Sequence, residues 1–434
     1  MSKEDKLALS RVEGLIPELR FPEFKNEGEW EINEFGELIN ILADYTANGS
    51  FASLKENVTY YNSDEYAVLV RTTDLDKKTF TPARFTDKRG YDFLSKTSLY
   101  GNEIVMANVG SIGKVFRVPY FNKPMTLAPN TYVLKFYDFV DEGFIYQLMV
   151  RPEFEKKLLS MVGSSTLMAI NKGNLRSIKV AVPKRKEQQK IASCLSSLDE
   201  VITVQSQKLE LLKDHKKGLM QNLFPQDGEK VPKFRFKEFE KEGEWRQKEL
   251  SELGFLINGL TYSPEDVRDQ GLLVLRSSNI QNGLIDLIDC VYVREDINGA
   301  NLTQPKDILI CVRNGSKNLI GKNAIIPQGI PFATHGAFMT VFRAKNPKFV
   351  FQLFQTDYYD KQVKADLGAT INSINGKNFI KYKFPVPENP KEQQKIASCL
   401  SSLDALITAQ AGKIEHLKLH KRGLMQGIFP KIND

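Results

Sequence analysis

The chain contains the same fourteen-residue segment twice, KEQQKIASCLSSLD, at residues 186–199 and again at residues 391–404. An identical run of that length does not arise by chance, so the chain is an internal duplication. The match continues at the same offset of 205 residues as far as Pro225 and Pro430, with 29 of 40 positions identical. A chain built in this way is expected to fold as two similar halves.

A second repeated block opens each half. Residues 17–30, PELRFPEFKNEGEW, match residues 232–245, PKFRFKEFEKEGEW, at 9 of 14 positions, and both tryptophans of the chain lie there. The offset is 215 at this block and 205 at the other, so the stretch between the blocks is ten residues longer in the first half (215 − 205 = 10). Constant blocks therefore bracket variable stretches.

The long constant block is predicted to be a helix with a coiled-coil seam, because apolar residues recur at an alternating spacing of four and three. A helix of about 38 residues is about 57 Å long. Gln205 and Gln410 are polar residues at matching seam positions, and Gly218 and Gly423, followed by prolines, are predicted to end the helices. The seam positions are Ile191, Leu195, Leu198, Ile202, Gln205, Leu209, Leu212, Lys216 and Leu219 in the first copy, and Ile396, Leu400, Leu403, Ile407, Gln410, Ile414, Leu417, Lys421 and Leu424 in the second.

The two helices are expected to pair with each other as an antiparallel coiled coil, which would relate the two halves by a pseudo-twofold axis. The alternative is that each helix packs only on its own domain. Each variable stretch combines short β-rich runs with a helical segment, which predicts an α+β domain of about 150 residues. The predicted β-rich runs are 65–75, 102–118 and 131–137 in the first half, and 271–280, 306–327 and 338–344 in the second. The predicted domains are residues 1–183, a first helix in 184–225, residues 226–389 and a second helix in 390–434.

Composition narrows the class of protein. Hydrophobic residues make up 41% of the chain and charged residues 26%, which is typical of a globular protein. The chain has no apolar run long enough for a membrane span and no apolar signal-peptide core near its start, so we expect a cytoplasmic protein without membrane contact. Cys194 and Cys399 occupy equivalent places in the repeat and are expected to be reduced. The net charge of +7 is spread over 60 basic and 53 acidic residues, so it decides nothing alone.

The sequence offers no convincing active site. Gly110, Gly113 and Lys114 are too closely spaced for a nucleotide-binding P-loop. Glu155 and Lys157 fit a nuclease-like pattern, but no partner aspartate is placed with them. His416 and His420 lie four apart on the predicted helix, yet no further ligand completes a metal site. We therefore expect no catalytic residue, no metal and no bound cofactor.

Polar loops after the predicted strands are better candidates, for binding DNA. Arginine can pair with guanine and asparagine with adenine, whereas lysine and hydroxyl groups can anchor phosphates. For any single loop the plainer interpretation is a solvated turn, but the loops recur in both halves. The candidate DNA-binding residues are Arg71, Thr72, Thr73, Asn108, Ser111, Lys114, Thr166, Asn171 and Lys172 in the first half, and Arg276, Ser277, Asn279, Arg313, Asn314, Ser316, Lys317, Lys322, Thr370, Asn375 and Lys377 in the second.

The two EQQKIASCLSSLD elements, each following a variable domain that closes on AVP or PVP, resemble the specificity subunit of type I restriction-modification systems. The resemblance covers essentially the whole chain. It implies two target-recognition domains that each recognise one half of an asymmetric bipartite site in double-stranded DNA. It also implies helices that space these domains and dock two methyltransferase subunits, with restriction translocase-nuclease subunits joining for cleavage.

In the family, S-adenosylmethionine, ATP and Mg²⁺ would be bound by those partner subunits, and no catalytic residue is carried over to this chain. Two other interpretations remain open at this point. The chain could be the specificity module of a related DNA-modification defence system, or a coiled-coil scaffold that binds protein and has no salt-dependent affinity for DNA.

Overall fold

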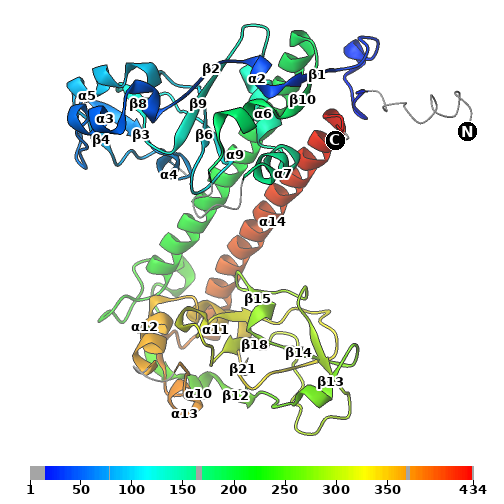
Figure 1. The fold of residues 1–434 in the computed structure, drawn as a ribbon. Coiled ribbons are helices and arrows are strands. Elements are labelled where there is room, and N and C mark those ends of the chain that lie inside the picture. The colour runs from blue at the N-terminus through cyan, green and yellow to red at the C-terminus, as the bar shows by residue number, and fades with distance from the viewer. Residues whose placement is uncertain (1–14, 78, 163–168, 368–371, 433–434) are drawn as a thin grey trace, which may run out of the picture. The chain divides into compact units, whose positions relative to one another are not determined.

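A computed structural model describes residues 15–77, 79–162, 169–367 and 372–432. The chain forms two compact units, residues 1–205 with 413–434, and residues 206–412. Two helices of 39 residues each, α9 (Arg185–Leu223) and α14 (Pro390–Ile428), are divided between the units. Each unit therefore contains the first part of one long helix and the last part of the other (Figure 1).

The first unit holds two four-stranded sheets. One has the order β2-β9-β6-β7 and is antiparallel throughout, and the other has the order β4-β3-β8-β5, in which β3 and β8 are parallel. These strands are mostly buried, and their apolar side chains form the core of the variable domain. Their bounds are β2 (Ile39–Asp44), β3 (Ala67–Val70), β4 (Phe85–Thr86), β5 (Ser98–Leu99), β6 (Ile104–Ala107), β7 (Val115–Arg117), β8 (Met125–Leu127) and β9 (Thr131–Phe136).

The second unit repeats the antiparallel sheet, but in its mixed sheet the parallel pair lies at the edge and not in the centre. Its antiparallel sheet has the order β12-β21-β18-β19, and its mixed sheet, β13-β17-β14-β20, again contains one parallel pair, β14 with β20. The predicted α+β duplication is therefore confirmed. The bounds are β12 (Gly254–Asn258), β13 (Val267–Arg268), β14 (Leu272–Leu275), β17 (Val291–Val293), β18 (Ile308–Cys311), β19 (Asn323–Ile325), β20 (Ala333–His335) and β21 (Met339–Ala344), with a hairpin of β15 (Ile280–Gln281) and β16 (Leu284–Ile285).

The two ends of each variable stretch lie together. In the first unit β1 (Glu31–Glu34) pairs antiparallel with β10 (Lys179–Val182), and in the second β11 (Arg246–Glu249) pairs with β22 (Lys383–Val386). The chain thus enters and leaves each variable domain beside the start of a long helix. This closure explains how the variable stretches can differ in length while the constant blocks stay in register.

Each helical stretch predicted as one segment is two helices. They are α6 (Glu142–Met149) and α7 (Pro152–Ser160) in the first unit, and α11 (Pro347–Leu353) and α12 (Asp357–Asp366) in the second. Pro152 separates the first pair because proline is tolerated in the first turn of a helix but not inside one. The remaining helices are η1 (Pro22–Phe24), α2 (Phe35–Leu38), η2 (Tyr45–Asn48), α3 (Phe51–Asn57), α4 (Thr72–Leu75), α5 (Lys88–Phe93), η3 (Ser95–Thr97), α8 (Lys172–Arg176), η4 (Lys237–Phe239), α10 (Leu250–Leu253), η5 (Pro264–Asp266), η6 (Ser277–Asn279), η7 (Lys317–Leu319) and α13 (Gly376–Phe379).

Two predicted β-rich runs end earlier than expected. In the runs at 65–75 and 271–280 the first strand ends at Val70 and at Leu275, and a short helical turn follows each, with Ile280 already in β15. Local hydrogen bonds close these turns: Arg71 binds the side chain of Asp74, and Asn279 Oδ1 accepts the backbone N–H of Arg276. Such local bonds from polar side chains compete with strand pairing.

The predicted seam is confirmed, since every seam residue of both long helices is buried or half-buried. In the first unit Leu195 of α9 belongs to the same core as Ile428 of α14, and in the second Leu400 of α14 belongs to the same core as Leu223 of α9. The start of one long helix therefore packs with the end of the other inside each unit, which is antiparallel pairing. Each helix also packs on its own variable domain.

Of the predicted stop signals, the prolines are confirmed and the glycines are not. Both helices continue through Gly218 and Gly423, to Leu223 and Ile428, and stop just before the prolines. The glycines have helical neighbours on both sides, so only the prolines, which cannot donate a backbone hydrogen bond, end the helical pattern.

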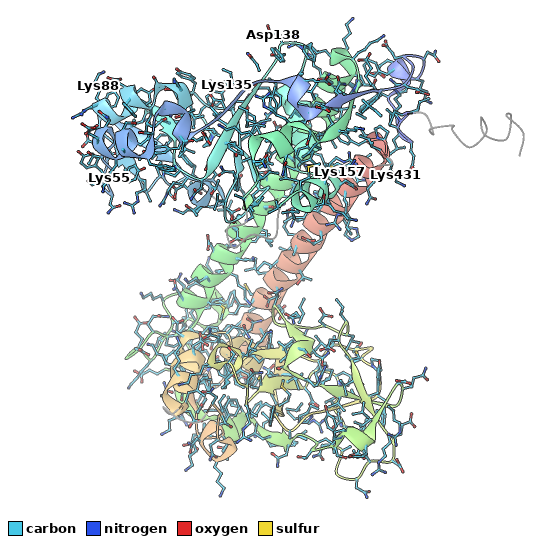
Figure 2. All side chains as sticks on the ribbon, in the orientation of Figure 1. Lys55, Lys88, Lys135, Asp138, Lys157 and Lys431 are labelled. Atoms are coloured by element: carbon cyan, nitrogen blue, oxygen red, sulfur yellow. The ribbon has the colours of Figure 1, made fainter. Side chains whose placement is uncertain are left out.

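No helix in the described part of the chain is both long and apolar enough to cross a membrane. Lys55 and Lys88 are exposed on the first unit (Figure 2).

Candidate functional site

A buried ion pair joins the constant block that opens each half to the start of the long helix that follows its variable domain. In the first unit Arg20 donates from Nε and Nη2 to the two carboxylate oxygens of Glu187, at 2.8 and 2.7 Å, and the side chains are only 6% and 2% exposed. In the second unit Arg235 binds Glu392 in the same way, at 2.8 Å for both bonds. Both glutamates lie in the first turn of a helix, where a negative charge is favourable.

A second polar contact also recurs in both units. Lys421 donates to Asp199 at 2.6 Å in the first unit, and Lys216 donates to Asp404 at 2.6 Å in the second. These pairs join the end of one long helix to the start of the other. No local sequence pattern indicated these ion pairs, although every member of them lies in a repeated block, which was the available signal.

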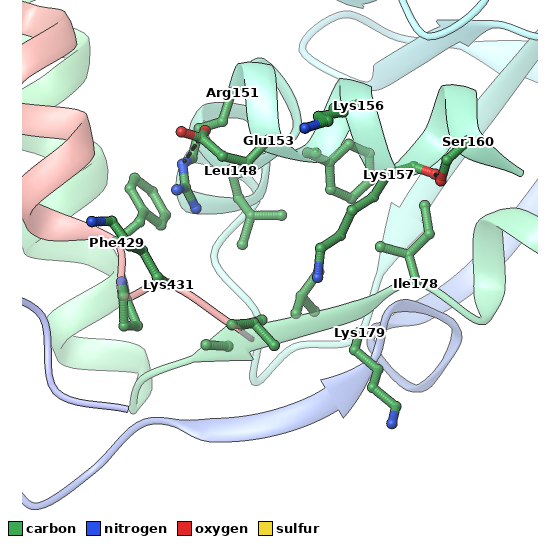
Figure 3. Close-up of a pocket in the computed structure, with 15 residues that line it drawn as sticks. Leu148, Arg151, Glu153, Lys156, Lys157, Ser160, Ile178, Lys179, Phe429 and Lys431 are labelled. Atoms are coloured by element: carbon green, nitrogen blue, oxygen red, sulfur yellow. Dashed lines mark hydrogen bonds and ion pairs between the residues drawn. The ribbon is translucent and has the colours of Figure 1, made fainter. Parts of the chain in front are cut away.

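A pocket of about 510 Å³ lies in the first unit where α7, β10 and the residues after α14 meet (Figure 3). Its floor is apolar and includes Leu148, Phe154 and Phe429, whereas its rim is basic. Arg151 lies over the Phe429 ring at 4.6 Å, and burial lowers the pKa of this arginine. The basic side chains that line the pocket are Arg151, Lys156, Lys157, Lys179 and Lys431, beside one acidic side chain, Glu153.

The candidate DNA-binding loops of the first half come together at one edge of the first unit. The loop after β6 meets the segment before α8 through an isolated bridge between Val109 and Ala169, and the Ile170 amide donates to the Asn108 carbonyl at 3.2 Å. The same loop meets the turn after β3 through an ion pair of 2.9 Å between Lys114 and Asp76. Three loops that are distant in sequence thus form one surface.

Within this surface the predicted residues differ in what they can offer a ligand. Arg71 donates two hydrogen bonds to the buried Asp74, which raise the pKa of Arg71. Its charge is therefore paired within its own loop. Lys172 forms an ion pair of 3.1 Å with Asp44. Thr73 and Ser111 are exposed, and Thr72 and Asn108 are half-buried.

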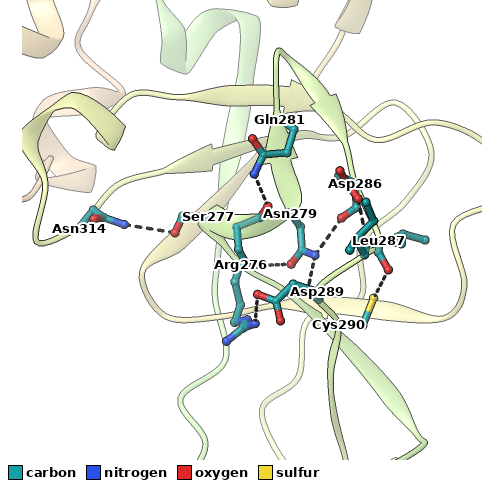
Figure 4. A network of polar contacts seen from close by, with 11 residues as sticks. Arg276, Ser277, Asn279, Gln281, Asp286, Leu287, Asp289, Cys290 and Asn314 are labelled. Atoms are coloured by element: carbon teal, nitrogen blue, oxygen red, sulfur yellow. Dashed lines mark hydrogen bonds and ion pairs between the residues drawn. The ribbon is translucent and has the colours of Figure 1, made fainter. Parts of the chain in front are cut away.

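The same three loops converge in the second unit, and Figure 4 shows the contact between two of them. Asn314, in the loop after β18, donates to the Ser277 hydroxyl at 3.2 Å, which ties this loop to the turn after β14. An isolated bridge between Arg313 and Ser373 joins it to the segment before α13. The arrangement is the counterpart of that in the first unit, although few of the side chains are the same.

Asn279 and Arg276 support the loop of the second unit from inside. Asn279 is completely buried, and its side-chain nitrogen donates to the carbonyls of Asp286 and Asp289, both at 2.9 Å (Figure 4). Arg276 donates to the Asp289 carboxylate at 2.8 Å. Arg313 is exposed and lies over the ring of Phe338 at 5.8 Å, which makes it the better placed arginine for contact with a ligand.

The remaining candidates fall into three groups. Asn171 and Asn375 cap helices α8 and α13 with their side-chain oxygens, so their amides organise the loop ends. Ser316, Lys317 and Lys377 are exposed, and Lys322, which directly precedes β19, is half-buried. Thr166 and Thr370 lie outside the described residues.

The alternative chemical sites of the sequence analysis lie apart from one another. Glu155 and Lys157 are on α7, and His416 and His420 are exposed on α14. Within the described ranges no group of three or more histidine, cysteine, aspartate or glutamate side chains is arranged to hold a metal ion. The loop surfaces are therefore the sites that the geometry favours.

Comparison with known proteins also points to DNA recognition. The domain family described as "Type I restriction modification DNA specificity domain" matches the chain twice, at residues 27–214 and 242–419. The StySPI specificity subunit of Salmonella potsdam is 30% identical over 183 residues, and the EcoKI specificity subunit of Escherichia coli is 32% identical over 186 residues. Each match covers 40% of this chain and 39% of the relative, so the chain matches about two-fifths of the length of these curated relatives.

A longer match links the chain to the putative MjaX specificity subunit of Methanocaldococcus jannaschii, which is 23% identical over 417 residues and 92% of each chain. Among solved structures, the type I restriction-modification S subunit of M. genitalium has a similar fold, with a TM-score of 0.61 over 96% of this chain and 100% of that one, at 16% identity. A chain from a structure of a type I restriction-modification system gives a TM-score of 0.51 over 92% of this chain and 97% of that one, at 15% identity.

Proposed function

Because this chain belongs to the family of type I restriction-modification DNA specificity proteins, we propose that it is a non-catalytic, sequence-specific DNA-binding subunit. Each unit recognises one half of a bipartite site in double-stranded DNA through its three-loop surface. Because the two surfaces carry different side chains, the two half-sites differ and the whole target is asymmetric.

One observation carries this proposal. In both units the loop after β6 or β18 contacts the turn after β3 or β14 on one side and the segment before α8 or α13 on the other. A shared scaffold that presents different side chains is what recognition of two different base sequences requires, since base edges are distinguished by side-chain hydrogen bonds.

The proposed partners are two methyltransferase subunits, docked on the long helices, and restriction translocase-nuclease subunits that join for cleavage. Support comes from Val201 and Leu406, which occupy the same position in the two copies of the helix and are both exposed and apolar. Two equivalent apolar positions suit two copies of one partner. S-adenosylmethionine, ATP and Mg²⁺ belong to these partners in the proposal, and the chain itself contributes target choice.

The test is single-molecule methylome sequencing of a host with and without this gene, each co-expressing the neighbouring methyltransferase. We expect one asymmetric bipartite motif to lose its methylation when the gene is deleted. If the methyltransferase is active and no motif changes, DNA specificity is not the function of this chain. A coiled-coil scaffold that binds only protein would then become the leading interpretation.

A further inference from the structure

The structure locates the ten residues by which the first half exceeds the second. The offset between the halves is 215 at the start of β2 and β12 (254 − 39), and 205 at the start of β3 and β14 (272 − 67). The extra residues therefore lie between β2 and β3. There the first unit has η2 and α3, whereas the equivalent stretch of the second unit, which is fully described, has only η5 and β13.

The inserted helix α3 forms one wall of a pocket of about 610 Å³. Ser50 caps the helix, and the buried side chains of Leu54 and Val58 fix it to the domain. Phe51, at its first position, is 79% exposed, so its ring is accessible to a ligand in the pocket. The pocket is lined by Asp44, Tyr45, Thr46, Phe51, Leu54, Lys55, Val58, Tyr60, Asn108, Pro129 and Asn130.

Asn108 belongs both to the candidate DNA-binding surface and to the lining of this pocket. Its backbone is fixed on both sides, since its N–H donates to the Asn130 carbonyl and its carbonyl accepts the Ile170 N–H, both at 3.2 Å. The side-chain oxygen is buried, yet it accepts no hydrogen bond from any described residue. A buried polar atom without a partner is costly and calls for an explanation beyond folding.

The second unit shows that the fold does not need an asparagine at this place. The counterpart is Val312, whose N–H donates to the Phe338 carbonyl at 3.0 Å and whose carbonyl accepts the Ile374 N–H at 2.8 Å. The same backbone bonds thus form around an apolar side chain. The amide of Asn108 is therefore peculiar to the first unit, as is helix α3.

Other residues that line the pocket are of types that bind nucleotides. The half-exposed ring of Tyr60 stands in the same pocket as Phe51, and its hydroxyl donates to that of Tyr45 at 2.8 Å. Lys55 lies one turn after Phe51 on α3 and is exposed (Figure 2). Aromatic rings stack on nucleobases, an amide can bond a base edge, and an ammonium group attracts phosphate. The volume lies within the range of about 300–1,000 Å³ that suits small ligands.

We propose that this pocket receives one nucleobase of the half-site recognised by the first unit, after that base has left the helical stack. Phe51 and Tyr60 contact the face of the base, Asn108 forms hydrogen bonds with its edge, and Lys55 holds the adjacent phosphate. The proposal rests on the proposed function and adds that the first unit distorts its half-site whereas the second unit lacks the inserted helix for doing so.

The test uses the full chain in complex with its methyltransferase and duplexes that carry the methylome-defined motif. 2-Aminopurine, whose fluorescence rises when it is unstacked, is placed in turn at each position of both half-sites. Methyltransferases extrude the base that they modify, so the methylated positions are left out. We expect a fluorescence rise at one position of one half-site, which Phe51→Ala abolishes while weakening binding on the order of tenfold.

Asn108→Val, which introduces the residue of the second unit, should relax base preference at that position alone. The matched control is Tyr120→Ala, because Tyr120 is also 79% exposed but follows β7, at the end of the sheet opposite Asn108. The control should change neither fluorescence nor preference. No fluorescence rise at any position, or a rise that both pocket variants leave intact, would overturn the proposal. If the wild-type complex selects no bipartite motif at all, the proposed function fails instead.

Discussion

At the scale of single residues, one buried ion pair in each unit connects the two constant blocks. Arg20 with Glu187, and Arg235 with Glu392, are the same contact made twice, although the variable stretches between the partners differ. Charged side chains this deeply buried are stable only as a pair, because an unpaired charge in the interior loses its hydration without compensation. The repeated blocks therefore have a structural reason to remain alike.

Arg20→Ala leaves the Glu187 carboxylate buried without its partner. We expect the free energy of unfolding of the first unit to fall by about 3–5 kcal/mol. Urea unfolding followed by circular dichroism measures the loss. The control is Lys88→Ala, which breaks an exposed ion pair with Asp92 and should leave the free energy of unfolding nearly unchanged. Equal losses in the two variants would show that the buried pair is not a principal fastening.

His335 gives the second unit a sensitivity to acid. This histidine is buried at the end of β20, where the equivalent residue of β8 is Leu127. Burial lowers the pKa of His335 below its usual value of about 6.5, and the Ile257 carbonyl and Asp307 oppose this only in part. The unfolded chain therefore takes up a proton before the folded one does, so stability present above pH 6.5 is lost as the pH falls.

His335→Leu should remove this part of the pH dependence. We expect the difference in melting temperature between pH 7 and pH 5 to be smaller in the variant than in the wild type, as measured by thermal unfolding. His416→Gln, which changes an exposed histidine, serves as the control and should keep the wild-type difference. An unchanged pH dependence in His335→Leu would mean that the buried imidazole does not govern acid stability.

At the scale of elements, the long helices have two distinct faces. The seam positions are buried or half-buried, whereas Val201 on α9 and Leu406 on α14 are exposed outside the seam. Exposed apolar side chains on a helix cost solubility and are typical of contact surfaces. The proposed docking of methyltransferase subunits therefore makes a prediction for these two positions.

Val201→Glu and Leu406→Glu should each weaken docking of one methyltransferase subunit by about 2 kcal/mol, because a charge would be buried in an apolar contact. Analytical ultracentrifugation should show one bound subunit in either single variant and none in the double variant at moderate concentrations. Thr203→Glu places the same charge on another exposed face of α9 and should leave two subunits bound. A double variant that still binds both subunits would place the docking surface elsewhere.

At the scale of the whole molecule, the duplication makes the two variable domains exchangeable in principle. Both enter and leave through a two-stranded ribbon beside a long helix, and in both units the same ion pair joins the constant blocks that flank the domain. A domain transplanted between the constant blocks would meet the same partners at both ends. Target choice should then follow the transplanted domain and not its place in the chain.

Replacing residues 246–390 by a second copy of residues 31–185 keeps Arg235 and Glu392, which lie outside the exchanged stretch. We expect methylation of a motif made of two copies of one half-site, detected by methylome sequencing. The reciprocal chimera, with residues 31–185 replaced by residues 246–390, should methylate two copies of the other half-site. A folded chimera that retained the original asymmetric motif would contradict recognition by separate units.

The sequence by itself determined the features that depend on local pattern. The duplication, the long helices with their seam and most strands follow from identity and periodicity, because helix and strand periods are set by backbone geometry. It also predicted which loops carry polar side chains, and the structure brings three of them together in each unit. The sequence did not distinguish Arg313, which is exposed, from Asn279, which is completely buried in the same surface.

Only the tertiary structure decided which of the predicted residues are exposed, because burial depends on which distant segments pack against a side chain. The ion pair of Arg20 and Glu187 joins residues 167 positions apart, and no local pattern indicates it. The ten extra residues of the first half were visible as a difference between two offsets, but the sequence did not show where they lie. Their place beside Asn108 follows from strand pairing, since β6 and β9 bring distant chain segments to one edge of a sheet.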